Sequence, residues 1–244
     1  MQKTLQENNF SKAMIGLSGG VDSAVTLTLC VNSLGKENVY AALLPCGNLN
    51  KKGGLLAKKI IRKNKLPEKN IFDINIQEPI ALLLKKLPQT DRVRRGNIIA
   101  RVRMTILFDL AKKLGALVVG TENKSEHLLG YFTRFGDESS DIELIRNLYK
   151  TEVYRLAKQL EIPPEIIKSF PTAGLWNGQT DEGELGFSYS EADPILYFLY
   201  EKREPLAKII KRGFSRDLIL KVKGRVEINI FKQETPYVFS VNSS

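Results

Sequence analysis

The octapeptide Gly16–Ser23, with the sequence GLSGGVDS, has the residue types and spacing of an anion-binding turn. An apolar run precedes it and an apolar helical pattern follows it, so we expect a strand, a tight turn and the start of a helix. Such a turn leaves backbone N–H groups free, and the helix dipole adds partial positive charge. We therefore predict that it binds a phosphate chain. Asp22 suits this cradle if Mg²⁺ lies between its carboxylate and the phosphates.

The octapeptide differs from the two common nucleotide-binding loops. The GxxxxGK[ST] loop has a lysine before its last hydroxyl residue, where this chain has Asp22, and the dinucleotide pattern GxGxxG is not matched either. A capped helix start is the plainer interpretation of an SGG turn by itself. The full SGGVDS after a strand resembles the signature of the N-type ATP pyrophosphatases. That resemblance implies cleavage of ATP to AMP and pyrophosphate while a substrate is adenylated.

A second set of polar residues follows the expected fourth strand. Thr121 stands where a hydroxyl can meet a nucleotide, and Glu126 lies a few residues into an expected helix, where it could share a metal ion with Asp22. A glutamate in that position is more often a solvated helix residue. The loop 130–137 places aromatic residues between two glycines, which favours either packing on the core or stacking on a planar ring.

Strand and helix patterns alternate along the chain, which predicts how these residues are positioned. We expect strands at Ala13–Leu17, Val39–Leu44, Ile71–Ile76 and Leu117–Gly120, with a fifth near Ile142–Ile145. We expect helices at Asp22–Leu34, Gly53–Asn64, Pro79–Leu87, Gly96–Leu114, Lys150–Leu160 and Pro164–Ser169, then two helices in a tail that begins at about residue 194. The predicted fold class is α/β, with a flavodoxin-like or Rossmann-like parallel sheet and helices on both faces. Ligands in such folds bind beyond the carboxyl ends of the strands, where Ser18, Pro45 and Thr121 fall.

Composition limits the class of protein. The chain has 244 residues, 43% hydrophobic and 26% charged, and a net charge of +10. We predict a single domain over residues 1–244 in the cytoplasm, because no segment reads as an export signal or a membrane span. Cys30 and Cys46 read as small core residues, and the single histidine cannot support a metal site alone. The positive charge would suit a nucleic-acid surface, but solvated helix faces explain most of it.

Six segments in order resemble the ammonia-dependent NAD synthetases, from about Gly16 to Tyr189. They are SGGVDS, GNIIARVRM, GTENKSE, GYFTRFGD, LYKTEVYRLAK, and PTAGLW with QTDEGELG. The resemblance implies an adenine nucleotide alpha hydrolase-like fold, a homodimer, ATP as co-substrate and Mg²⁺ as cofactor. It also implies small-molecule substrates and argues against a nucleic-acid partner. The chain has no room for the glutaminase domain that some relatives carry, so ammonia is the expected donor unless a separate glutaminase subunit binds.

The resemblance also implies a role for individual residues. The ATP-binding set is Gly16, Leu17, Ser18, Gly19, Gly20, Val21, Asp22, Ser23, Thr121, Lys150 and Thr172. The metal ligands are Asp22 and Glu126, and Lys150, Asp22 and Thr172 form the catalytic set. The acceptor-binding set is Arg101, Arg134, Asp141, Phe231 and Lys232.

The implied reaction is ATP-dependent amidation of deamido-NAD to NAD through an adenylated carboxylate, with release of AMP and pyrophosphate. The chain departs from the family where Arg134 replaces a usual lysine, Gly174 a common aspartate and Phe231 a histidine. These departures leave nicotinate mononucleotide open as a second possible acceptor. Two different functions also stay open at this point: a tRNA-thiolating ATP pyrophosphatase, and a basic nucleotide- or RNA-binding module without activity.

Overall fold

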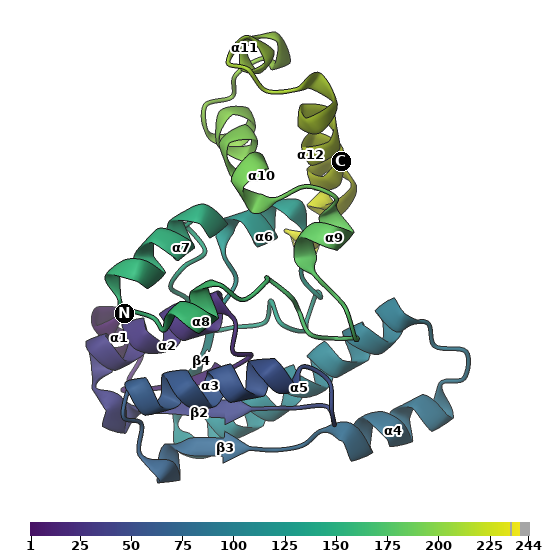
Figure 1. Ribbon diagram of the computed structural model, residues 1–244. Helices are drawn as coiled ribbons and strands as arrows, with labels where there is room; N and C mark the ends of the chain where they lie inside the picture. The colour runs from purple at the N-terminus through teal and green to yellow at the C-terminus, as the bar shows by residue number, and fades with distance from the viewer. Residues whose placement is uncertain (235, 240–244) are drawn as a thin grey trace, which may run out of the picture.

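Five parallel strands form the central sheet of the structure, a computed structural model that describes residues 1–234 and 236–239 (Figure 1). The strand order is β3-β2-β1-β4-β5, so the direction in which successive strands are added reverses between β1 and β4. The strands are β1 (Lys12–Gly16), β2 (Val39–Leu43), β3 (Ile71–Asp73), β4 (Ala116–Gly120) and β5 (Ile142–Glu143). The α/β fold predicted from the alternating patterns is confirmed, although β3 and β5 are shorter than expected.

Helices cover both faces of the sheet. One face carries α2 (Val21–Leu34), α3 (Lys51–Lys63), α7 (Lys150–Gln159) and α8 (Pro164–Ile167). The other face carries α4 (Gln77–Lys86) and α5 (Arg92–Leu114). A short helix α1 (Gln2–Glu7) precedes the sheet, and single 3₁₀ turns η1 (Lys36–Asn38) and η2 (Glu68–Asn70) lead into β2 and β3.

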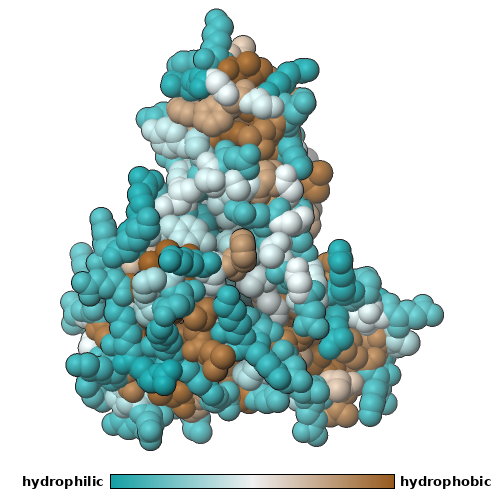
Figure 2. All heavy atoms as spheres, in the orientation of Figure 1, coloured by the Kyte–Doolittle hydropathy of each residue, from teal (hydrophilic) through white to brown (hydrophobic). Residues whose placement is uncertain are grey.

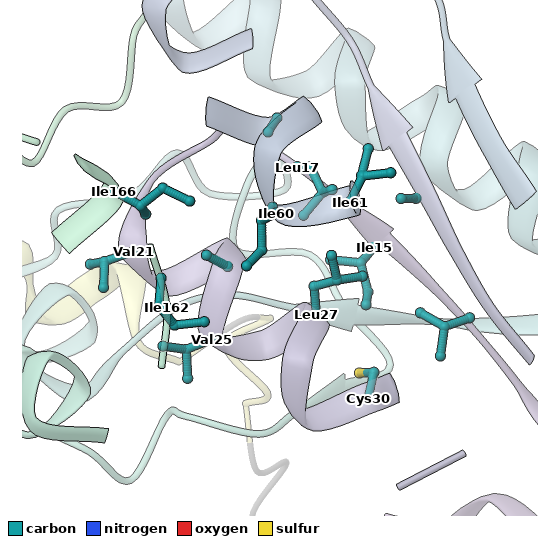
Figure 3. Close-up of a cluster of buried hydrophobic side chains, with 14 of the residues drawn as sticks. Ile15, Leu17, Val21, Val25, Leu27, Cys30, Ile60, Ile61, Ile162 and Ile166 are labelled. Atoms are coloured by element: carbon teal, nitrogen blue, oxygen red, sulfur yellow. The ribbon is translucent and has the colours of Figure 1, made fainter. Parts of the chain in front are cut away.

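Side chains alternate between the two faces along β1, as the period of a strand requires. Ala13 and Ile15 join the cluster under α2 and α3, whereas Met14 joins the cluster under α4 and α5. Figure 3 shows the first cluster, in which Ile15 and Leu27 meet Ile60 of α3. Burial on both faces holds the sheet rigidly, so the carboxyl ends of its strands offer a fixed platform for a site.

Helix α5 begins earlier than the pattern predicted. Asp91 is its N-cap, and the Asp91 carboxylate accepts a hydrogen bond from the Arg94 N–H at 2.8 Å. The capping aspartate starts the helix at Arg92, four residues before the expected Gly96.

A helical unit follows the sheet region and extends away from it (Figure 1). In the described part of the chain it comprises α10 (Tyr189–Leu196), the π-helical turn η3 (Tyr197–Glu201), α11 (Leu206–Lys211), α12 (Arg216–Asn229) and the turn η4 (Ile230–Lys232). Three α-helices thus replace the expected two, and the first starts at Tyr189 rather than at about residue 194. Its core packs onto Leu129 of α6 (Lys124–Leu129) and onto Tyr149, next to the start of α7.

Hydrophobic side chains gather at the far end of this unit, over α11 and its neighbours (Figure 2). A short helix α9 (Asp181–Leu185) connects the unit to the sheet region. None of the helices among the described residues has both the length and the apolar character needed to cross a membrane.

Candidate functional site

A cavity of about 540 Å³ lies where the carboxyl ends of β1, β2 and β4 meet the first turns of α2 and α3. The order of the strands reverses between β1 and β4, which is where open α/β sheets bind their ligands. All of the predicted ATP-binding residues except Gly19 line this cavity, including Thr121, Lys150 and Thr172 from later segments. The structure therefore brings the predicted ATP-binding set together around one space.

The phosphate loop, residues 16–20, leaves β1 and enters α2 through tight local contacts. Gly20 is the N-cap of α2 and supplies no side-chain cap, so the helix start remains open toward the cavity. The Ser18 hydroxyl accepts a hydrogen bond from the Gly20 N–H at 3.2 Å, and the Ser23 hydroxyl donates to the Gly20 carbonyl at 3.1 Å. Gly19 has φ +83°, and a Cβ there would lie 2.0 Å from the Gly53 carbonyl oxygen. Only glycine fits this turn, because α3 packs directly against it.

Asp22, Glu126 and Lys150 form a buried group that we call the carboxylate–lysine centre. The Lys150 Nζ donates to Asp22 Oδ2 at 2.6 Å and to Glu126 Oε1 at 2.9 Å. The Lys150 side chain is 2% exposed. These residues are far apart in the sequence and come from the starts of α2, α6 and α7. All three line the cavity, so the centre forms a charged wall beside the phosphate loop.

Asn123 holds the centre together and was not singled out from the sequence. It is the N-cap of α6, and its Oδ1 accepts from the Glu126 N–H at 3.1 Å. Its Nδ2 donates to Asp22 Oδ1 at 2.9 Å. The Asn-x-x-Glu spacing is that of a capping box, which could have marked Asn123 and Glu126 as a local pair. The hydrogen bond from Asn123 to Asp22 could be found only from the fold, because the two residues are far apart in the sequence.

Charges in the centre shift one another's pKa values. Burial alone would lower the pKa of Lys150, but the carboxylates of Asp22 and Glu126 outweigh it and raise that pKa well above its ordinary value. Burial raises the pKa of Glu126, against the opposing pull of Lys150. Lys150 is therefore a permanent cation at the edge of the cavity, where it can meet the negative charge of a phosphate chain.

The donor set of the centre fits Mg²⁺. Asp22 and Glu126 present two carboxylates that converge on one cation in the structure, and both line the cavity beside the phosphate loop. Mg²⁺ in nucleotide sites is commonly held by one or two carboxylates together with phosphate oxygens and water. Two convergent carboxylates next to a phosphate cradle meet that description.

Asp181 is a further carboxylate of the cavity, and it was not singled out as a site residue from the sequence. It is 3% exposed, and its Oδ2 accepts from the Tyr189 hydroxyl at 3.3 Å. Burial raises its pKa to about 6, although Lys150 opposes the shift. Its Thr-Asp context at the start of α9 is an ordinary N-cap pattern, so the residue types gave no sign that the side chain turns inward.

Thr172 lies in the loop 169–175, which forms one side of the cavity. The Thr172 hydroxyl accepts from the Gly174 N–H at 3.1 Å. Gly174 has φ +63°, and a Cβ there would lie 2.8 Å from Asn50 Nδ2, so this loop packs against the first turn of α3. The glycine at this position, which the sequence marked as unusual for its family, matches a left-handed backbone and a close approach.

The predicted acceptor-binding residues lie outside the lining of the cavity and form a second set, which we call the outer group. The Arg101 Nε donates to the Arg134 carbonyl at 3.3 Å, and the Arg134 guanidinium lies 5.5 Å from the Phe231 ring centroid. The Lys232 Nζ donates to the carbonyl of Gly130 at 2.7 Å. The fifth member, Asp141, accepts from the Val118 N–H at 2.8 Å and so holds the edge of β4. Three members thus contact one another in a row, and Lys232 follows the third of them in the chain.

The described geometry agrees with comparisons against known proteins. The family model described as NAD synthase matches residues 1–236. The chain belongs to the NAD synthase family. A protein from Fusobacterium nucleatum named NH(3)-dependent NAD(+) synthetase is 39% identical over 241 residues, which are 99% of this chain and 92% of the relative.

Two solved structures resemble this family member over nearly their whole lengths. An NH3-dependent NAD synthetase from Campylobacter jejuni has a TM-score of 0.82 and 34% identity, covering 98% of this chain and 94% of that one. The NMN synthetase from Francisella tularensis has a TM-score of 0.83 and 30% identity, covering 99% and 93%. Relatives of this kind do not favour a tRNA-thiolating enzyme or a module that only binds nucleic acid.

Proposed function

We propose that this NAD synthase family member catalyses the ATP-dependent amidation of deamido-NAD with ammonia. The observation that carries the proposal is the buried Lys150 between Asp22 and Glu126, directly beside a phosphate loop and inside a cavity large enough for a nucleotide. The names of the most similar relatives support it, because they are NH(3)-dependent NAD(+) synthetases.

The proposed chemistry activates a carboxylate. The nicotinate carboxylate attacks the α-phosphorus of ATP, which forms an acyl adenylate and releases pyrophosphate. Ammonia then attacks the acyl carbon and releases AMP together with the amide. Residues 16–23 would bind the phosphates that leave, and Thr121 and Thr172, which also line the cavity, would position the nucleotide. Lys150 would stabilise the charge that develops on the phosphates, so catalysis is mainly positioning and electrostatic stabilisation.

Asp22 and Glu126 would hold Mg²⁺ when ATP binds. A bound ion there would neutralise phosphate charge and favour departure of pyrophosphate. Lys150 Nζ now contacts both carboxylates, so its ammonium group would have to share them or turn toward the phosphates.

The outer group would bind the remote part of the acceptor, since Arg101, Arg134 and Lys232 supply cations beside the ring of Phe231. Arginine and lysine are suited to phosphate oxygens, and the aromatic ring is suited to stacking on a base. A dinucleotide reaches such a surface more readily than a mononucleotide does. The likeness to an NMN synthetase makes nicotinate mononucleotide the acceptor to test beside it.

The direct test is an end-point assay of the purified protein with deamido-NAD, ATP, Mg²⁺ and ammonium. We expect NAD, AMP and pyrophosphate in equal amounts, and ADP as the product would contradict the mechanism. Parallel assays replace deamido-NAD by nicotinate mononucleotide, and ammonium by glutamine. Asp22→Asn is the matched control in which the proposed site is impaired. It keeps the shape of the side chain and removes one negative charge from the centre.

The expected partners are small molecules and a second copy of this chain. Exposed apolar side chains in and between α4 and α5, among them Leu82, Leu87 and Val93, favour a homodimer. Sedimentation at several concentrations tests that expectation. The ammonia-dependent relatives argue against a separate glutaminase subunit. The cytoplasmic location stays a prediction from the sequence.

A further inference from the structure

Asp193 lies in α10, in the helical unit, yet its carboxylate faces the elements that carry the carboxylate–lysine centre. The residue is 4% exposed and lies outside the lining of the cavity. Tyr189, one helical turn earlier on α10, places its ring 5.1 Å from the Lys150 Nζ. Residues four apart share a face of a helix, so one face of α10 meets the start of α7 at both positions.

The first N–H groups of α7 have no partners within their own helix, as at any helix start. Tyr149, the N-cap, supplies no side-chain cap hydrogen bond to them. The Lys150 N–H donates instead to the Ser125 hydroxyl at 2.8 Å, and the Thr151 N–H donates to Asp193 Oδ2 at 2.8 Å. The side chains of Ser125 and Asp193, which belong to other elements, therefore fix the backbone at Lys150 and at the residue that follows it.

The same carboxylate also fixes α6. The Ser125 hydroxyl donates to Asp193 Oδ1 at 2.6 Å, and Ser125 directly precedes Glu126 in α6. Ser125 is fully buried, and the two oxygens of Asp193 are each used by one partner. Asp193 thus connects the Thr151 N–H, next to Lys150, with the Ser125 hydroxyl, next to Glu126, through two hydrogen bonds, and its negative charge lies at the positive end of α7.

We propose that Asp193 is a positioning residue that holds Lys150 and Glu126 at their working separation through Ser125 and the Thr151 N–H. The proposal rests on the proposed function for its kinetic consequences. It makes the helical unit part of the catalytic apparatus, because the unit contributes the carboxylate that ties α6 to α7. The Lys150 ammonium must meet the phosphates within a fraction of an ångström, and a displacement of about 1 Å can cost on the order of 100-fold in rate.

The experiment compares Asp193→Asn with Asp217→Asn, which makes the same chemical change at an exposed residue in the first turn of α12. We expect kcat of Asp193→Asn to fall roughly 30- to 100-fold while KM for ATP and for deamido-NAD stays within about threefold. A purely structural role would lower the melting temperature and leave kcat of the folded enzyme unchanged. A folded Asp193→Asn enzyme with the kcat of the Asp217→Asn control overturns the proposal.

Ser125→Ala supplies a second arm if Asp193→Asn does not fold. It leaves the charge of Asp193 in place and removes the hydroxyl that joins Asp193 to the Lys150 N–H. We expect a fall in kcat of about tenfold. In the double variant the losses should not multiply, because both changes break one connection. Multiplying losses, or an unchanged kcat for Ser125→Ala, contradict the connection.

Amide hydrogen exchange tests the network without any assay of turnover. We expect slow exchange at the Lys150 and Thr151 amides of the wild type, and exchange about tenfold faster or more in each variant that folds. Fast exchange of the Thr151 amide in the wild type overturns the proposal even if neither variant folds. A wild type that forms no NAD contradicts the proposed function, whereas this exchange pattern still decides the role of Asp193.

Discussion

The carboxylate–lysine centre and the outer group solve the problem of holding charge in opposite ways. In the centre, a lysine that is 2% exposed contacts two carboxylates, and a fourth side chain, Asn123, donates to one of the carboxylates. In the outer group, Arg101 and Lys232 donate to main-chain carbonyls, and Arg134 lies over an aromatic ring. The cation of the centre is paired with carboxylates, whereas the outer group presents its positive charge without a carboxylate partner in these contacts.

This difference indicates a division of work. A buried centre whose side chains are already held in place by hydrogen bonds is suited to charge that develops in the transition state. More exposed cations would gain their partner only when an anionic ligand arrives, so we expect them to contribute mainly to binding. Substitutions in the centre should therefore lower kcat, and substitutions in the outer group should raise KM for the acceptor.

The largest expected effect comes from Lys150→Met, which keeps most of the length of the side chain and removes its charge. We expect kcat to fall by about 10³-fold or more, because the cation beside the phosphates is lost. The two carboxylates would remain buried without it, so stability should also fall, and Mg²⁺ with ATP should restore part of the melting temperature. Rapid-quench measurement of pyrophosphate release checks the rate. Turnover within about tenfold of the wild type would place the reacting phosphates elsewhere.

Gly19→Ala should act next most strongly, and through the backbone. A Cβ at Gly19 would lie 2.0 Å from the Gly53 carbonyl oxygen, and φ there is +83°. We expect a loss of about 1–3 kcal/mol in the free energy of unfolding, together with weakened ATP binding as the loop moves off α3. Urea unfolding and calorimetric titration measure the two effects. Gly224→Ala in α12 is the control, since open space surrounds that glycine and alanine favours a helix.

Arg134→Ala should have a smaller effect, confined to the acceptor. We expect KM for deamido-NAD to rise roughly tenfold, with kcat and KM for ATP within about threefold, because a charged contact made equally in ground and transition states is removed. Initial-rate kinetics with each substrate varied in turn separates the parameters. Arg94→Ala, an exposed arginine in the first turn of α5, is the matched control. A fall in kcat with unchanged KM would contradict the assignment of catalysis to the centre and of acceptor binding to the outer group.

Local patterns predicted the strand, the glycine turn and the helix start at residues 12–23, because these three parts are contiguous in the sequence. The sequence also predicted that Glu126 lies a few residues into a helix, and α6 confirms this. The burial of Lys150 did not, since LYKTEVYRLAK reads as an ordinary amphipathic helix start. Its depth depends on α10, which covers it with Tyr189 from a distant part of the chain.

The helical unit shows the same limit of local reasoning. Its helices were expected from composition, but no sequence pattern singled out Asp193. Only the fold shows that its carboxylate reaches the Thr151 N–H and the Ser125 hydroxyl. The outer group is similar, because Phe231 and Arg134 meet only when the turn η4 returns beside residues 130–134.

The smallest expected effect concerns Glu143, which lies in β5 two residues after Asp141 of the outer group. Its Oε1 accepts from the Ser140 hydroxyl at 2.8 Å, and its Oε2 is buried without a hydrogen-bond partner. Burial raises the pKa of Glu143 from 4.5 to about 7. The folded state therefore holds the proton more tightly than the unfolded state does, so the contribution of this group to stability should be highest below pH 4.5 and decline as pH rises toward 7.

Glu143→Gln removes this titration and should flatten the decline. Urea unfolding of both proteins at several pH values between about 5 and 8 measures it, with the exposed Glu37→Gln as the control. As pH rises across that range, we expect the free energy of unfolding of the variant to increase relative to that of the wild type by an amount on the order of 1 kcal/mol. NAD formation should be unchanged. Parallel curves would mean that the carboxylate is compensated by water or by the positive charge of Arg146, which opposes the rise in the pKa of Glu143. An altered KM for the acceptor would instead mean that Glu143 acts on the outer group. The charge of Glu143 would then affect Asp141, which lies two residues earlier and is held at the edge of β4.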